Sequence, residues 1–168
     1  MATQTSSLIG ANLSGASSDA TALFALGTTA DGTSGSRWEY IEVTATCITG
    51  EFVLISPAGT GTRLRVASLT ANASGYDIGA CQGGLNQGEF AWVAKQGRNL
   101  YILCTGTITA GNDTGVGFVN TGRLAVEPSA AVGSTAWGIF LTSSTPTTGG
   151  ANATLGTITF PRVATKDV

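Results

Sequence analysis

The stretch Gly88–Asn112, GEFAWVAKQGRNLYILCTGTITAGN, decides the fold that the sequence predicts. It contains two apolar runs, Glu89–Gln96 and Leu100–Ile108, joined by the polar connection Gly97-Arg98-Asn99. Successive side chains of a strand point to opposite faces, and neither face of either run is plainly polar. Both runs therefore read as strands of a closed or doubly covered sheet. We expect a central β-hairpin, with these core side chains: Phe90, Trp92, Tyr101 and Leu103.

Further short apolar runs lie between glycine-rich turn signals on both sides of this unit. The clearest is Trp38–Thr46, in which Ile41 and Val43 alternate with polar residues. No segment has the periodicity of an amphipathic helix, and strands spaced in this way favour a β-barrel or β-sandwich of about ten short strands. Thr28–Ser36 and Ser143–Thr154 read as loops. The other strands are expected at Ala22–Leu26, Glu51–Ser56, Thr62–Ala67, Tyr76–Cys81, Gly115–Val119, Arg123–Val126, Ala136–Thr142 and Leu155–Phe160.

The chain of 168 residues is expected to form one all-β domain over residues 21–163, followed by a short tail at 164–168. Residues 1–20 have only three sizeable apolar side chains, Leu8, Ile9 and Leu13, which are too few to form a core element. We interpret this segment as an extended N-terminal arm. It is either a frayed terminus or a segment that adds to the sheet of a partner.

Composition bounds the possible partners. Only 11% of the residues are charged although 42% are hydrophobic, and a surface with so little charge favours coverage by a partner protein over a merely poorly soluble domain. The net charge of −2 and the scattered basic residues argue against nucleic-acid binding. No apolar run approaches the ~20 residues of a membrane helix. The three cysteines are expected to be buried reduced thiols, which fits synthesis in the cytoplasm.

The residues that enzymes use are poorly represented. The chain has no histidine, which removes the commonest general base and metal ligand. Glu39 and Glu42 would lie on opposite faces of a strand, so they do not form a carboxylate pair. We therefore predict that the protein is not an enzyme and that it has no cofactor or metal site. Trp38, Trp92 and Trp137 all fall in predicted strands, where core packing explains them better than a sugar-stacking surface.

The order of short phrases over residues 38–163 resembles the head decoration (cement) proteins of tailed bacteriophages. The phrases are the segment Gly88–Gly97, the Thr/Ala-rich turn Thr107–Asn112, the GIFLT motif of Gly138–Thr142 and the closing phrase Thr159–Val163. The chain departs from that pattern at Thr159, where the family pattern leads us to expect Asn, and in having a longer arm and first loop.

This resemblance implies a structural virion protein that binds the outer surface of the expanded phage head and stabilises contacts between major capsid subunits. The implied partners are the major capsid protein and further copies of the chain, with a homotrimer favoured over a dimer. The arm residues Leu8, Ile9 and Leu13 are the expected capsid contacts. A glycan- or receptor-binding head-fibre or lectin-like module is the alternative, and it predicts exposed aromatic side chains.

Overall fold

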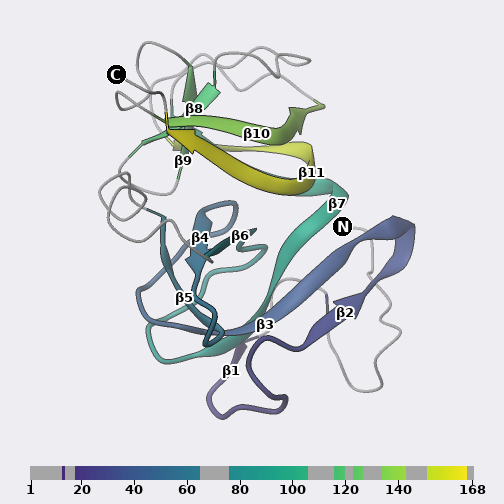
Figure 1. Cartoon of the computed structure of the whole chain (residues 1–168), viewed down its shortest axis with the longest axis vertical. Helices are drawn as coiled ribbons and strands as arrows, with labels where there is room; N and C mark the ends of the chain where they lie inside the picture. The colour runs from purple at the N-terminus through teal and green to yellow at the C-terminus, as the bar shows by residue number, and fades with distance from the viewer. Residues whose placement is uncertain are drawn as a thin grey trace.

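The computed structural model describes residues 13, 18–64, 76–105, 116–119, 123–126, 134–142 and 151–165. These residues form eleven strands and one three-residue 3₁₀-helix, and they include no α-helix, which confirms the all-β prediction (Figure 1). The elements are β1 (Ser18–Asp19), β2 (Thr29–Asp31), η1 (Thr33–Gly35), β3 (Arg37–Val43), β4 (Phe52–Ile55), β5 (Thr60–Arg63), β6 (Asp77–Ala80), β7 (Phe90–Thr105), β8 (Val116–Val119), β9 (Arg123–Val126), β10 (Ser134–Leu141) and β11 (Ala151–Thr165).

Five strands close into a ring. β7 pairs with β6, β6 with β4, β4 with β5, β5 in parallel with β3, and β3 again with β7. Closure leaves this part of the sheet without a free edge. β10 and β11 extend the sheet from the far end of β7, and β8 and β9 lie next to them (Figure 1). The barrel is therefore small and carries a separate group of strands above it.

The predicted central hairpin is wrong, because β7 is one strand of sixteen residues. Gly97, Arg98 and Asn99 form a bend with a β-bulge. Between the pairs Gly156↔Leu100 and Ile158↔Gly97, β7 advances three residues while β11 advances two. β3 pairs with β7 before the bend and β11 pairs with it beyond, so neighbouring strands hold the backbone extended. Bulges and hairpin turns both use residues with positive φ, and that shared chemistry misled the sequence prediction.

Other boundaries also differ from the predictions. Ala22–Leu26 is not a strand, and the predicted loop Thr28–Ser36 contains β2 and η1. β11 begins at Ala151 and ends at Thr165, so it is much longer than the predicted Leu155–Phe160 and enters the predicted tail. β1 lies within the predicted arm and pairs with the beginning of β7. Strand β9 matches its prediction, and strands β3, β4, β6 and β8 deviate by at most three residues at either end.

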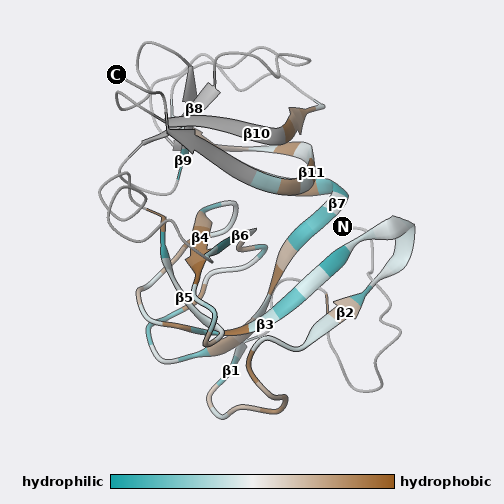
Figure 2. Cartoon of the chain, viewed as in Figure 1, coloured by the Kyte–Doolittle hydropathy of each residue, from teal (hydrophilic) through white to brown (hydrophobic). Residues whose placement is uncertain are grey.

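Apolar side chains are buried on both faces of the barrel strands, which the sequence indicated for the β7 segment but not for β3, where it predicted one polar face. On β3, Trp38 and Tyr40 belong to one buried cluster, while Ile41 and Val43 belong to a second. Phe52 and Val53 divide between the same two clusters on β4. Figure 2 shows the corresponding hydrophobic colouring on β4 and on the lower part of β7. The fold is held by two apolar layers around a shared set of strands.

Leu13 requires a correction. It was expected to contact a capsid from an extended arm, but its side chain is fully buried in the first of these clusters. Burying a leucine side chain contributes about 1.5–3 kcal/mol to the free energy of folding. Leu13 therefore stabilises the core and is not exposed to a partner. Leu8 and Ile9 lie outside the described residues.

Candidate functional site

The four residues that were expected to meet in the hairpin are spread along β7. Trp92 lies before the bend and Leu103 beyond it, and both are buried, whereas Phe90 and Tyr101 are half-buried. Trp92 packs edge-on with Phe24, at a centroid distance of 5.2 Å, and lies 5.1 Å from the ring of Tyr40. Trp92 belongs to the first buried cluster and Phe90 packs against it, whereas Tyr101 and Leu103 lie beyond the bend, so the four side chains form no common site.

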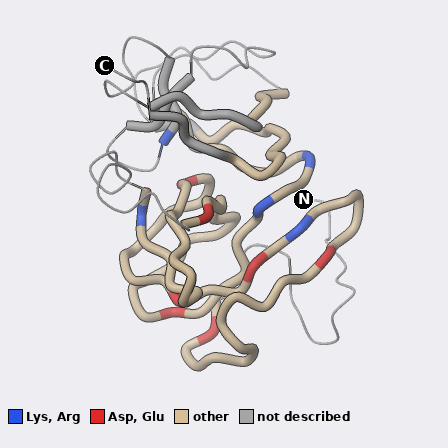
Figure 3. The backbone as a smooth tube through the Cα atoms, viewed as in Figure 1, with Lys and Arg blue, Asp and Glu red and all other residues tan. Residues whose placement is uncertain are grey.

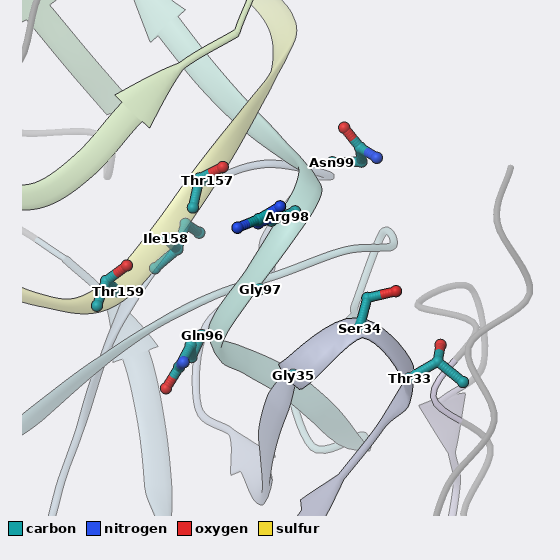
Figure 4. A pocket seen from close by; sticks show the side chains of 10 residues that line it. All are labelled: Thr33, Ser34, Gly35, Gln96, Gly97, Arg98, Asn99, Thr157, Ile158 and Thr159. Carbon is teal, nitrogen blue, oxygen red and sulfur yellow. The ribbon is translucent and has the colours of Figure 1, made fainter.

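A cleft of about 600 Å³ lies at the bend of β7. Three segments distant in the sequence build it, namely η1, the bend itself and the middle of β11 (Figure 4). Its lining is mostly hydroxyl and amide groups with one guanidinium: Thr33, Ser34, Gly35, Gln96, Gly97, Arg98, Asn99, Thr157, Ile158 and Thr159. No pattern in the sequence joined these segments, so sequence reasoning missed the cleft.

The backbone around this cleft holds unusual conformations. Among the described residues, three non-glycine residues have positive φ: Ser34 at 60°, Asn99 at 56° and Phe160 at 43°. Ser34 and Asn99 line the cleft and Phe160 follows the lining residue Thr159. Such conformations cost about 1–3 kcal/mol each and persist only where the surrounding structure imposes them. The paired strands β7 and β11 hold two of these residues, Asn99 and Phe160.

A second feature is an exposed apolar patch on the sheet beyond the bend, formed by Phe140, Leu155 and Tyr101. Phe140 on β10 is 45% exposed and Leu155 on β11 is 39% exposed, while Tyr101 of β7 is half-buried directly across from Leu155. Phe140 pairs with Thr157, two residues along the same face of β11. Among the described residues, β10 pairs only with β11.

A buried carboxylate joins the barrel to the strands above it. The Glu51 side chain is 1% exposed, and its Oε2 accepts a hydrogen bond from the Ile48 N–H at 3.0 Å. Arg63 Nε lies 3.2 Å from Oε2, and Arg123 Nε of β9 lies 3.6 Å from Oε1. Because a buried charge is costly unless it is paired, this cluster has a structural role.

A second ionic cluster lies on three barrel strands. Lys95 of β7 is largely buried and donates to Glu39 of β3 at 2.8 Å and to Asp77 of β6. The two carboxylates offset the charge of the ammonium and accept hydrogen bonds from it, which gives the cluster a structural role.

The three cysteines are free and buried, as predicted. Burial raises the pKa of the Cys104 thiol to about 12, so it stays protonated and unreactive at neutral pH. The hydrogen bond with Cys47, together with burial, also raises the pKa of Cys81. None of the three combines exposure with a stabilised thiolate, which a catalytic cysteine requires.

Within the described part of the chain, no group of three or more Cys, Asp or Glu residues could hold a metal ion. The one helix there, the three-residue η1, is far too short to cross a membrane. Comparison of the chain with family models, with curated proteins and with solved structures finds no match. The candidate sites are thus the polar cleft at the bend of β7 and the exposed apolar patch beside it.

Proposed function

We propose that the protein is a capsid decoration protein that binds the outer surface of an expanded phage head, as its sequence resemblance implies. The exposed apolar patch is the observation that carries the proposal. Phe140 and Leu155 project from neighbouring strands of one sheet face, where a partner protein could cover both together. A chain with 11% charged residues offers few charges that such a partner would have to desolvate.

The expected contribution of this patch is modest for each copy. About half of each side chain is already buried, so covering the remainder of Phe140 and of Leu155 contributes about 1 kcal/mol each. Many copies on a symmetric shell multiply that contribution. A protein that binds only the expanded shell stabilises the shell against reversal by mass action.

The edge of β10 that has no pairing partner among the described residues supports a further part of the proposal. An exposed edge strand can accept a strand from another chain through main-chain hydrogen bonds. That strand could come from the major capsid protein or from another copy in a trimer or dimer. Since Leu13 is a core residue, the proposed capsid contact of the N-terminal segment is confined to Leu8 and Ile9.

Co-sedimentation with expanded, undecorated heads of the encoding phage tests the function, with unexpanded procapsids as the comparison. We expect saturable binding to expanded heads only. Phe140→Ser together with Leu155→Ser should weaken that binding about tenfold or more. Leu23→Ser is the matched control, because Leu23 is 63% exposed but lies between β1 and β2, and it should bind like the unaltered protein. Failure to bind either shell would refute the proposed function.

The alternative of a glycan- or receptor-binding module gains no support from the described tryptophans. Trp38 and Trp92 are both buried, and the Nε1–H of Trp38 donates to Ser36 at 3.1 Å. A sugar-stacking surface needs exposed rings. These two tryptophans are core residues, as the sequence suggested.

A further inference from the structure

We propose that the cleft at the bend of β7 binds an acidic saccharide, that is, a sugar chain carrying carboxylate groups. The proposal does not depend on capsid decoration, because it is argued from the described residues of this chain that line the cleft. Its volume of about 600 Å³ lies within the range of about 300–1,000 Å³ that is usual for small-ligand sites. Three observations define the ligand: the charge of the lining, its hydrogen-bonding groups and its lack of aromatic rings.

The charge of the cleft is positive. Arg98 is the only charged residue among the described lining residues, and no ion pair joins it to any carboxylate in the described part of the chain. Figure 4 shows its side chain extending from the bend of β7 toward Thr157 and Ile158 of β11. Figure 3 shows basic segments on β3 and on β7 near the bend, but Arg37 of β3 and Lys95 of β7 are paired with carboxylates, so the positive charge of the described lining comes from Arg98. An exposed guanidinium that forms no ion pair with the described residues of a concave site favours an anionic ligand, and its planar fork fits a carboxylate.

A neighbouring arginine shows that this arrangement is particular to Arg98. Arg37 of β3 pairs with Gln96 in the sheet, but its Nε lies 3.4 Å from the Asp31 carboxylate. Arg37 therefore has its counter-ion within the chain and does not line the cleft. Arg37 and Arg98 are close in the fold, but only Arg37 is paired with a carboxylate among the described residues.

The remaining lining groups suit a ligand with many hydroxyls. Ser34 and Thr159 are exposed hydroxyls on opposite sides of the cleft, and Asn99 and Gln96 add amides that can both donate and accept. No aromatic ring belongs to the described lining, so a neutral sugar would lack the stacking surface that usually supplies affinity. Charge has to take the place of stacking, which points to an acidic rather than a neutral saccharide.

The backbone prepares this arrangement before any ligand arrives. Asn99 has φ of 56° and Ser34 has φ of 60° and ψ of 27°, both in the left-handed region. The strand pairings of β7 with β3 and β11 fix the bend on both sides. A rigid bend spares the ligand the ordering cost that a mobile loop would impose on binding.

Isothermal titration calorimetry of the full chain with trigalacturonic acid tests the proposal, with neutral galactotriose as the matched probe. We expect the acidic trisaccharide to bind and the neutral one to bind at least about tenfold more weakly. Arg98→Gln removes the charge while keeping a polar side chain. It should weaken trigalacturonate binding about 10- to 100-fold, the range for losing a charge-assisted hydrogen bond.

Arg37→Gln is the control, since it removes an equal charge close to the cleft but outside its lining. It should leave binding within about twofold of the unaltered protein. Equal losses from both substitutions would overturn the proposal in favour of general attraction by surface charge. Equal binding of the two trisaccharides would overturn the acidic specificity, and absence of binding to the unaltered, folded protein would overturn the site. Because no capsid enters this assay, its outcome is separate from the co-sedimentation test.

Discussion

Replacing Glu51 by Gln should destabilise the protein strongly, because it removes the buried charge shared by two arginines. The Glu51 side chain is 1% exposed, while those of Arg63 and Arg123 are 28% and 27% exposed. Removing one partner of a buried ion pair costs about 3–5 kcal/mol. Water reaches part of both arginines, so we expect the lower end, about 3 kcal/mol. That loss is a large part of the free energy of unfolding of a typical domain, which is about 5–15 kcal/mol.

Gln is the informative substitution because its size is unchanged and it can still accept the Ile48 N–H bond. The measurement is equilibrium unfolding in urea, followed by the fluorescence of the buried tryptophans. Glu42→Gln is the control, because Glu42 of β3 is half-buried and has no ion pair among the described residues. It should change the unfolding free energy by less than about 0.5 kcal/mol. If Glu51→Gln costs less than about 1 kcal/mol, the cluster is effectively solvated and the reasoning is wrong.

Three further predictions concern packing, pH and the bend. Gly61→Ala should lower the free energy of unfolding by about 1–3 kcal/mol, because the added Cβ would lie 2.3 Å from Ile41 Cδ1, and a second substitution, Ile41→Val, should restore part of that loss. Gly156→Ala should not be rescued by shortening a neighbouring side chain, because its added Cβ would lie 2.7 Å from a backbone carbonyl oxygen. Because the pKa of Cys104 is raised in the folded state, the folded protein keeps a proton that the unfolded chain loses at high pH. The free energy of unfolding should therefore fall as pH rises from about 9 toward 12, by up to about 1.4 kcal/mol per pH unit. The urea midpoint of Cys104→Ala should fall less steeply over this range than that of the unaltered protein. Asn99→Gly should keep the melting temperature within a few degrees of that of the unaltered protein. Asn99→Val should lower it, because a β-branched residue is strained at φ of 56°. Equal melting temperatures for the two variants would show that the bend relaxes.

The strands that the sequence predicted well are short apolar runs with turn residues near their ends. β4 falls within its predicted range and is followed closely by Pro57, and β3 begins one residue before its predicted range and ends three residues inside it. The length of β11 was underestimated because the sequence contains an apparent end signal that does not end the strand. Pro161 usually ends a strand, but here it lies at an irregularity where pairing with β10 shifts between Trp137 and Ile139.

The cleft and the Glu51 cluster could not be predicted from the sequence, because the residues that form each of them are far apart along the chain. The cleft brings together residues 33–35, 96–99 and 157–159, and only the pairing of β7 with β3 and β11 makes them neighbours. Glu51 follows a glycine and precedes a strand, which is typical of a surface turn, and its counter-ion Arg123 is 72 positions away in the sequence. Long-range pairing of this kind leaves no local periodicity to recognise.

Thr157 connects the cleft to the apolar patch, which gives the two proposals a physical relation. Thr157 lines the cleft and pairs with Phe140 of the patch across β10 and β11. A partner that covers Phe140 and extends past Thr157 would close the cleft, whereas one that stops at Leu155 would leave it open to solution. Trigalacturonate added to the co-sedimentation assay separates these two geometries. Displacement of the protein from heads would place the cleft within the docked surface, and undisturbed binding would leave it free on the outside of the shell.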